Sequence, residues 1–460
     1  MNGAEVPTLG ARLDALPIGR WHIYMILICV LSFMFDGFDT QVIGPILPKL
    51  IGEWKLTNAQ VGMLGSAGFA GMALGSTLFG LLADIIGRLK VFPITLFWYA
   101  LLSGACALTV GFKSLFVMRF VVGMGLGGLI PVVMTYLAEY VPSKKRGQFT
   151  SYTSLGFLFG TVLAFTAGFA VVVPYGWKWG FVLGILPAFL APFLWRGLPE
   201  SVRYLLNKGR VADAVKVVEG LEKRILGKVT VSSEKAIEIE GYTTREEVRV
   251  RYRDLFKGGL AKSTIMLSLL WFAMMYNSYS ITIWLPIFVT KELGYGLGRG
   301  LAFLSLSALV GIVGYLVAAF MEDYWGRKKT VIFTFLLYGI DLYLLFSLGK
   351  NPTLGAVLMC LMFFANGGMW VSLYTYTPET FPTKVRATGT GFGLMFGRIG
   401  GICGPAVVGL MYAKFGIFGV LHVSVAILVV AIVVMLIIGK ETKGKTLEQI
   451  AMQQLQASAE

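Results

Sequence analysis

The chain has 460 residues, of which 56% are hydrophobic and only 14% are charged. A soluble globular protein has roughly 45–50% apolar and about 25% charged residues, so this composition indicates an integral membrane protein. It excludes a disordered chain, a fibrous repeat and a disulfide scaffold. The net charge of +15 would favour nucleic-acid binding in a soluble protein, but in a membrane protein its meaning depends on where the basic residues lie.

Crossing a bilayer as a helix takes roughly 20 apolar residues, and twelve stretches of the chain are of that kind. Six of them precede a polar segment and six follow it. They begin near Ile23, Val61, Val91, Leu115, Tyr152, Gly180, Ile265, Leu301, Val331, Leu354, Thr388 and Ile417. We therefore predict an all-α integral membrane protein with twelve transmembrane helices in two pseudo-symmetric six-helix bundles.

The polar segment divides the chain into four predicted parts. These are an N-terminal bundle at 1–197, a linker at 198–262, a C-terminal bundle at 263–440 and a tail at 441–460. Apolar residues recur at helical spacing in the linker, which is typical of short amphipathic helices lying beneath a membrane domain. Residues 1–20 are polar and lack the apolar core of a signal peptide, so we expect no cleavage.

The basic residues are distributed unevenly between the loops. With both termini placed in the cytoplasm, 30 of the 40 Lys and Arg residues lie on cytoplasmic segments and eight lie in outer loops. This bias follows the positive-inside rule and predicts a multi-pass protein of the inner (cytoplasmic) cell membrane with cytoplasmic termini. Two basic residues, Arg119 and Arg398, remain inside predicted spans.

Two motifs of the first half recur in the second half at one spacing. Ala-Asp-Ile-Ile-Gly-Arg at 83–88 and Glu-Asp-Tyr-Trp-Gly-Arg at 322–327 are 239 residues apart. Glu-Tyr-Val-Pro at 139–142 and Glu-Thr-Phe-Pro at 379–382 are 240 residues apart, and each is followed by an arginine. Duplicated six-span halves are typical of transporters. A channel would need a pore loop or a ring of like residues, and the sequence shows neither.

Charged residues at the cytoplasmic span ends are predicted to form a gating network. The network would close the inner side in the outward-open state and break on opening. A single surface salt bridge is usually worth less than about 1 kcal/mol, so any effect must come from the network; the alternative is simple anchoring of the topology. The residues are Asp84, Arg88, Glu139, Arg146, Glu200, Arg203, Asp323, Arg327, Glu379 and Arg386.

Three segments carry a family resemblance. Residues 80–90, Gly-Leu-Leu-Ala-Asp-Ile-Ile-Gly-Arg-Leu-Lys, and residues 119–128, Arg-Phe-Val-Val-Gly-Met-Gly-Leu-Gly-Gly, are similar to the loop and fourth-span signatures of the major facilitator superfamily. Pro-Glu-Ser-Val-Arg at 199–203 resembles the sixth-span ending of its sugar-porter-like branch. The resemblance covers nearly all of the chain and implies a transporter that works by alternating access.

Two further segments narrow the resemblance within that branch. Asp-Gly-Phe-Asp at 36–39 resembles the paired-aspartate motif of aromatic acid:proton symporters. Gly-Arg-Ile-Gly-Gly at 397–401 resembles organic-anion, aromatic-acid and nicotinate carriers. Sugar porters usually carry a Gln-Gln pair in the seventh span, whereas residues 274–279 read Met-Met-Tyr-Asn-Ser-Tyr. The resemblance therefore favours an aromatic acid over a sugar.

The charged residues of the first and fourth spans are the predicted proton-coupling residues. A charged side chain inside a span costs at least about 2.5–3.5 kcal/mol on insertion scales, which marks a functional site. If the two spans pack together, Asp39 and Arg119 can pair, and separating them would favour the protonated aspartate. The resemblance implies that this pair couples transport to protons; the alternative is a static ion pair. Asp36, one turn away, is either a relay or a structural partner.

Arg398, deep in the eleventh span, is the predicted anchor for a substrate carboxylate. A guanidinium matches a carboxylate with two parallel hydrogen bonds. The alternative is a permanent partner such as Asp341, in the middle of the ninth span. Otherwise we expect Asp341 to have a structural role.

Aromatic and amide residues of the seventh and tenth spans complete the predicted substrate site. Rings there can stack on an aromatic substrate, and the amides can donate to it or cap a broken helix. Lipid-facing or core packing is the alternative for each ring. The residues are Trp271, Tyr276, Asn277, Tyr279, Asn366, Trp370 and Tyr374.

The sequence shows no nucleophile–base set, metal-ligand spacing or phosphate loop, so we predict no enzyme activity and no metal. The glycines of 123–128 mimic a nucleotide-binding fingerprint, but they lie in an apolar span, where close helix packing explains them better. The predicted function is proton-coupled import of a small organic acid of the benzoate, hydroxybenzoate or nicotinate type. The predicted partners are that acid, protons as the only coupling ion, and the lipid bilayer; we expect a monomer and no nucleic acid. The alternatives are a sugar or organic-cation carrier, and a membrane sensor without transport.

Overall fold

The computed structural model describes residues 8–231, 252–257, 260–382 and 385–444. Eleven helices in these ranges are long and apolar enough to cross a membrane. The last of them, Arg386–Ile438, contains Gly416 with φ 64° and ψ −160°, which are not helical angles. Because Gly416 divides this helix into two spans, the described chain has the twelve predicted transmembrane helices, and the predicted fold class is confirmed.

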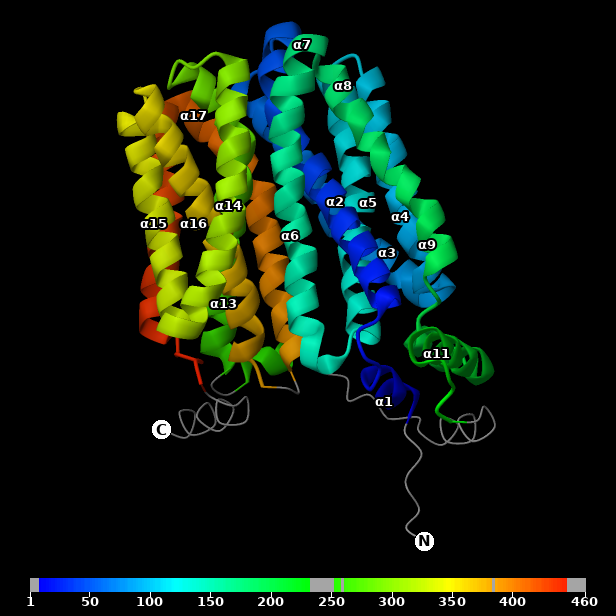
Figure 1. Cartoon of the computed structure of the whole chain (residues 1–460). Coiled ribbons are helices and arrows are strands. Elements are labelled where there is room, and N and C mark those ends of the chain that lie inside the picture. The colour runs from blue at the N-terminus through cyan, green and yellow to red at the C-terminus, as the bar shows by residue number, and fades with distance from the viewer. Residues whose placement is uncertain (1–7, 232–251, 258–259, 383–384, 445–460) are drawn as a thin grey trace.

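The spans form two groups of six (Figure 1). The N-terminal half consists of α2 (Arg20–Trp54), α3 (Asn58–Ile86), α4 (Arg88–Ala105), α5 (Phe112–Tyr140), α6 (Ser143–Ala167) continued by a π-helical turn (Gly168–Val172) and α7 (Val173–Tyr175), and α8 (Trp177–Val182) continued by a 3-10 segment (Leu183–Leu190) and α9 (Ala191–Gly197). The C-terminal half consists of α13 (Leu260–Lys291), α14 (Leu297–Trp325), α15 (Arg327–Leu348), α16 (Pro352–Thr380) and the two segments of α17 (Arg386–Ile438).

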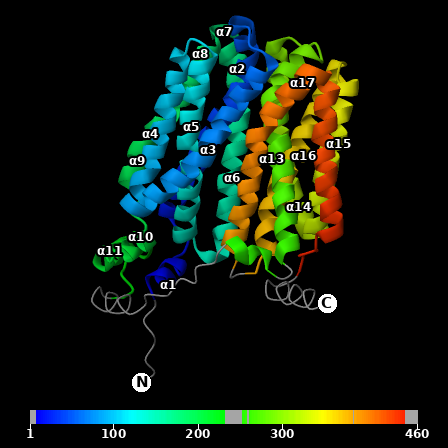
Figure 2. The same cartoon turned by 180° about the vertical axis from the view of Figure 1, so that it is seen from behind.

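Short helices lie on one face of the bundle, which we name the terminal face because α1 and residues 439–444 lie there (Figure 2). These helices are α1 (Leu9–Asp14), α10 (Val202–Asn207), α11 (Val211–Leu226) and a 3-10 turn (Tyr252–Phe256). The opposite face is the far face. The predicted linker helices are therefore present at 202–226, whereas residues 232–251 and 445–460 lie outside the described chain.

Glycines let the helices of the N-terminal half pack backbone to backbone. A Cβ atom at Gly71 or Gly75 of α3 would overlap the backbone of α5, and one at Gly123 or Gly127 of α5 would overlap that of α3. Small residues at such crossings are typical of membrane helices. The glycine-rich stretch of α5 is thus a packing surface, as expected from its place in an apolar span.

The two halves contact each other mainly toward the far face. Gly62 and Gly65 of α3 lie against Pro405 of α17. The hydroxyls of Thr166 and Ser305 are 2.6 Å apart and join α6 to α14. In the described chain, no ion pair joins the halves at the terminal face. The halves are therefore closed together on the far side.

The first helix is tied to the linker by a buried ion pair. Arg12 of α1 donates to both oxygens of Glu222 of α11, with Nε–Oε1 and Nη2–Oε2 distances of 3.0 and 2.8 Å, and both side chains are 1% exposed. Thr230 donates its backbone N–H to the same carboxylate. Burial opposes ionisation of Glu222, but the hydrogen bonds from Arg12 and Thr230 outweigh it and hold the pKa below its ordinary value of 4.5. The pair therefore stabilises this contact above that pH, and the stabilisation is lost as pH falls through the lowered pKa.

We expect Glu222→Gln to loosen α1 from α11 at neutral pH. Breaking a buried pair leaves one charge without its partner and costs about 3 kcal/mol, equivalent to a roughly 100-fold loss of protection. Amide hydrogen exchange of residues 9–14 measures it. The difference from the unmodified protein should vanish below the lowered pKa, where Glu222 of the unmodified protein is protonated and, like glutamine, carries no charge. Asp213→Asn, which removes the exposed pair with Arg210 on the same helix, is the control and should change protection little; an equal effect of both variants would contradict the assignment.

Candidate functional site

An ion pair inside the N-terminal half joins two of the predicted proton-coupling residues. Arg119 Nη1 lies 2.8 Å from Asp39 Oδ2, and Arg119 Nη2 donates to the Asp39 backbone carbonyl at 2.9 Å. Ser103 of α4 donates a short hydrogen bond to the other carboxylate oxygen, and the ring of Phe181 lies 5.8 Å from the guanidinium carbon. The Asp39 side chain is fully buried and that of Arg119 is 3% exposed. The first and fourth spans thus pack so that these charges neutralise each other.

Asp36 lies one turn from this pair but faces the interface between the halves. Its carboxylate is fully buried and has no hydrogen-bond partner. It lines a cavity together with Phe157 of α6 and with Tyr279 and Trp370 of the C-terminal half. Asp36 is therefore at the wall of the central cavity, whereas Asp39 lies behind it.

Aromatic rings from both halves form the walls of this cavity. The ring of Tyr279 lies 5.7 Å from Trp370 and 6.2 Å from Phe157, and Trp370 stacks on Tyr374 at 5.8 Å. Tyr374 also lines the cavity. Because offset and edge-to-face contacts of this kind also suit a bound aromatic ring, the cavity matches a flat apolar ligand.

A second, adjoining pocket shares the rings of Phe157 and Trp370 and is more polar. Gln41 of α2, Thr161 of α6 and Asn366 of α16 line it. Asn366 accepts a hydrogen bond from Ser278, and that hydroxyl accepts one from Trp370 Nε1. The Gln41 side-chain carbonyl is buried without a partner. Polar groups thus lie on the other side of the aromatic walls from Asp36.

Arg398 of α17 reaches across to the N-terminal half. Its Nη1 donates to the backbone carbonyl of Met72 at 2.9 Å. It also lies within electrostatic range of Asp36, Tyr279 and Tyr374. Within the described ranges no carboxylate lies within ion-pair distance of Arg398, so Asp341 is not its partner. Arg398 therefore lies within electrostatic range of Asp36 without forming a direct ion pair, and it is not one of the residues that line the cavity.

Three of the residues predicted to contact substrate lie outside the cavity wall. Tyr276 packs on Phe272 of its own helix. Asn277 points into the C-terminal half, where its Nδ2 donates to the Ala273 carbonyl. Trp271 donates its indole N–H to Thr377 and packs behind Trp370 and Tyr374. On α13 only the face that carries Ser278, Tyr279 and Thr282 is turned to the cavity in this conformation, so substrate contact by these three residues stays a prediction.

A charged cluster ends the N-terminal half at the terminal face. Arg88, the first residue of α4, forms an ion pair with Glu139 of α5. Glu200 Oε1 accepts the backbone N–H groups of Arg88 and Leu89 at 2.9 and 3.0 Å, and Ser201 donates to Glu139. The Glu200 carboxylate thus caps the positive N-terminal end of α4.

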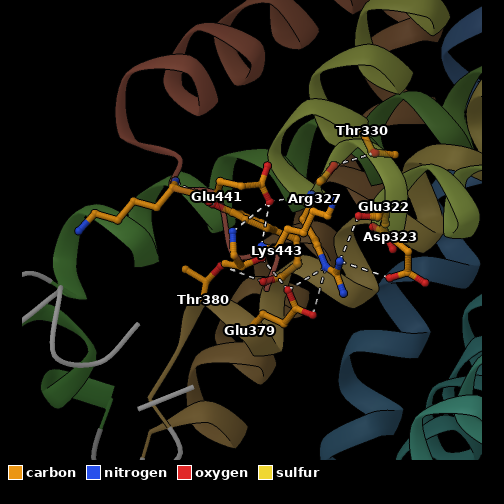
Figure 3. Close-up of polar contacts among 12 residues, drawn as sticks. Glu322, Asp323, Arg327, Thr330, Glu379, Thr380, Glu441 and Lys443 are labelled. Carbon is orange, nitrogen blue, oxygen red and sulfur yellow. Dashed lines mark hydrogen bonds and ion pairs between the residues drawn. The ribbon is translucent and has the colours of Figure 1, made fainter. Parts of the chain in front are cut away.

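The C-terminal half has the same arrangement (Figure 3). Arg327, the first residue of α15, lies 3.2 Å from Glu379 and 3.3 Å from Asp323. Glu441 Oε1 accepts the Arg327 backbone N–H at 2.8 Å, and Thr442 donates to Glu379 at 2.6 Å. Glu441 and Thr442 therefore occupy the places of Glu200 and Ser201, at an offset of 241 residues.

The predicted gating residues thus form two clusters, one in each half, instead of one network across the halves. Asp84 and Arg203 lie within electrostatic range of Arg88 in the first cluster. Arg146 donates to a backbone carbonyl before α6, and Arg386 is the first residue of α17. The halves do not meet through these charges in this conformation, and closure of the inner side by the network stays a prediction.

Several residues of the site were not among those predicted from the sequence. The 240-residue repeat contained the signal for Glu441 and Thr442, because Glu-Ser at 200–201 and Glu-Thr at 441–442 follow the last span of each half. Ser103, Phe157 and Gln41 had no such signal, since one serine, one phenylalanine and one glutamine do not stand out in apolar helices.

We expect Glu441→Gln to destabilise the C-terminal half. A carboxylate at a helix N-terminus contributes about 0.3–2 kcal/mol, and a neutral amide retains little of that. Thermal unfolding in detergent measures the change, and Glu200→Gln should have a similar effect because its contacts are equivalent. Asp323→Asn is the control, since that side chain is 79% exposed. An equal loss of stability in Asp323→Asn would refute a specific role for the caps.

Two six-helix halves that meet around a cavity at mid-depth, with charged residues inside the spans, define a secondary transporter of the major facilitator type. The model of the sugar (and other) transporter family matches residues 24–453. The chain belongs to this family, and it is a multi-pass membrane transporter and not an enzyme.

Relatives of known function cover nearly the whole chain. The niacin transporter of Acinetobacter baylyi is 35% identical over 451 residues, which are 96% of this chain and 100% of that protein. A gallate transporter of Pseudomonas putida is 31% identical, over 86% of this chain and 87% of that protein. The inward-open xylose transporter of E. coli shares the fold, with a TM-score of 0.74 and 19% identity, over 94% of this chain and 99% of that structure.

Proposed function

We propose that this chain imports a small aromatic or heteroaromatic carboxylate, of the nicotinate or hydroxybenzoate type, together with protons. The proposed place of action is the inner cell membrane, with both termini in the cytoplasm and the protein acting as a monomer. The relatives that transport niacin and gallate support this substrate class.

The observation that carries the proposal is the position of Arg398. Its guanidinium has no carboxylate partner in the described chain and lies within electrostatic range of Asp36, Tyr279 and Tyr374, which line the cavity. A carboxylate bound to Arg398 would place its attached ring among these side chains. The polar pocket with Gln41 and Asn366 would then meet a ring nitrogen or hydroxyl at the far end of the substrate.

Asp36 supplies a reason for proton coupling. A substrate carboxylate at Arg398 would lie near the Asp36 carboxylate, and two like charges in a buried site repel strongly. Protonation of Asp36 removes this repulsion and favours substrate binding. Asp39, one turn behind, exchanges its proton when the pair with Arg119 is broken. Loading of a proton and of the anion thus favour each other.

The charge distribution and the closed far side support the proposed orientation. The terminal face carries the linker, where basic residues are concentrated, and the positive-inside rule places such a face in the cytoplasm. The contacts of Gly62 and Gly65 with Pro405 close the far side. The described conformation then corresponds to an inward-facing or occluded state, and the separate charge clusters correspond to an open inner gate.

Ligand-induced thermal stabilisation tests the substrate class. We expect nicotinate or hydroxybenzoate to raise the melting temperature of the purified protein, since a ligand at 100 times its Kd stabilises the folded state by about 2.7 kcal/mol. Benzoate, which lacks a second polar group, should protect less. Protection by xylose and not by the acids would support the sugar-carrier alternative. Binding of the acid without uptake into proteoliposomes would support the sensor alternative.

A further inference from the structure

A buried carboxyl group in the C-terminal half takes no part in the site described so far. Asp341 lies in the middle of α15, its side chain is fully buried, and neither carboxyl oxygen has a hydrogen-bond partner. A buried charge without a partner is very costly, because its hydration is lost without replacement. The ionised form of Asp341 would therefore be strongly disfavoured at this position.

On the neighbouring helices, α17 and α13 each carry one buried side-chain oxygen that has no hydrogen-bond partner. The second segment of α17 runs alongside α15, with Leu428 near Gly339 and the His422 ring 5.9 Å from that of Tyr343. Ser424 lies on this stretch of α17, and its hydroxyl is buried without a hydrogen-bond partner.

The third helix of this cluster is α13. Asn277 Nδ2 lies 3.4 Å from the Ser424 carbonyl, and Tyr338 donates to the Asn277 carbonyl at 3.3 Å. The side-chain oxygen of Asn277 is also buried without a partner. A buried acid on α15, an unpaired hydroxyl on α17 and an unpaired amide oxygen on α13 therefore lie in the part of the C-terminal half where these three helices pack together.

The surrounding helices bring no charge to neutralise Asp341. On the helices packed against α15, the charged residues lie near the ends of α13, α14 and α16 and in the first segment of α17: Lys262, Lys291, Arg299, Glu322, Asp323, Glu379, Arg386, Arg398 and Lys414. The nearby titratable groups are Tyr338 on α15 and His422, whose ring nitrogen contacts the Phe418 carbonyl. Cys360 of α16 contacts Ser307, and Tyr315 of α14 lines the central cavity. A proton on Asp341 removes the charge and turns the carboxyl group into a hydrogen-bond donor.

The cluster is connected to the substrate cavity through α13. Asn277 directly precedes Ser278, whose hydroxyl accepts from Trp370 and donates to Asn366 in the polar pocket. A movement of α13 that changes these contacts would also move Asn277 relative to Tyr338 and Asp341. We propose that Asp341 is a second proton-binding site, which holds a proton in this conformation and releases it when α13 moves during transport. This inference rests on the proposed function for the link to transport, but the protonation of Asp341 does not depend on it.

The number of protons moved per substrate tests the proposal. In proteoliposomes at zero membrane potential, the accumulation of nicotinate at steady state is measured against the imposed pH difference. Each coupled proton raises the limiting accumulation about tenfold per pH unit. Asp341→Asn, which mimics the protonated carboxyl in shape, should lower the limit about tenfold per pH unit while transport continues. Asp213→Asn, which removes an exposed aspartate of α11, is the control and should leave the limit unchanged. An unchanged limit in an active Asp341→Asn protein would overturn the proposal.

A second measurement is needed if Asp341→Asn is inactive or if the unmodified protein shows no proton coupling. Infrared difference spectroscopy before and after addition of nicotinate detects the protonated carboxyl group directly. The expected result is a substrate-induced change in a protonated-carboxyl C=O band that persists in Asp39→Asn and is absent in Asp341→Asn. Identical difference spectra of the unmodified protein and Asp341→Asn would refute the site. A protein without coupling that still shows the Asp341 band would contradict only the proposed symport.

Discussion

Asp39→Asn is expected to lower the accumulation of substrate driven by a pH gradient while leaving exchange of substrate across the membrane intact. The asparagine can still bond with Ser103, which contacts the carboxylate in the unmodified protein, but it cannot bind or release a proton. The Arg119 charge, 2.8 Å from Asp39 in the unmodified protein, would lose its counter-charge. For each coupled proton lost, the limiting accumulation falls about tenfold per pH unit.

Uptake and counterflow in proteoliposomes with an imposed pH difference separate these two activities. Asp213→Asn is a matched control, because it removes an aspartate of α11 that is 41% exposed at the terminal face. Normal gradient-driven accumulation in Asp39→Asn would contradict proton coupling through Asp39. It would support the alternative that the Asp39–Arg119 pair is a static ion pair. Breaking a buried ion pair also costs about 3–5 kcal/mol, so the amount of folded protein must be compared before transport is scored.

Arg398→Ala is expected to weaken binding of the aromatic acid by roughly 30- to 1000-fold. Hydrogen bonds to charged groups contribute about 1.5–3 kcal/mol, and a guanidinium can make two of them to one carboxylate. These contributions amount to about 2–4 kcal/mol when partial compensation by water is allowed. Arg398→Lys keeps the charge but loses the two-pronged geometry, so it should fall between the alanine variant and the unmodified protein.

Binding of the acid by calorimetry or by thermal shift measures this effect directly. The control is Arg299→Ala, since Arg299 lies near the start of α14 against the Phe303 ring and away from the cavity. A neutral amide analogue of the substrate should bind the alanine variant and the unmodified protein with similar affinity. Unchanged affinity for the acid in Arg398→Ala would move the carboxylate site elsewhere.

The sequence was sufficient for the class, the number of spans and the duplication. Span length and apolar composition respond to the bilayer alone, so they can be recognised without knowing what the helices touch. The confirmed family follows from local motifs such as residues 80–90 and 119–128, which are contiguous in the chain. The repeat at 239–240 residues even contained the place of Glu441, although only the structure showed that its carboxylate caps α15.

The residues of the site depended on which face of each helix is turned to the cavity. Almost all positions in these spans are apolar on every side, and lipid and core place similar demands on a side chain, so periodicity does not separate them. Tyr279 therefore lies in the cavity wall, whereas Tyr276 and Asn277, on the same helix, point away from it. Charged residues could be identified as functional because a charge inside a membrane is costly wherever it points. Only the tertiary structure decided that Asp39 pairs with Arg119 and that Arg398 lies within electrostatic range of Asp36. It also decided that Asp341 has no hydrogen-bond partner. Each outcome depends on contacts between helices that are distant in the chain.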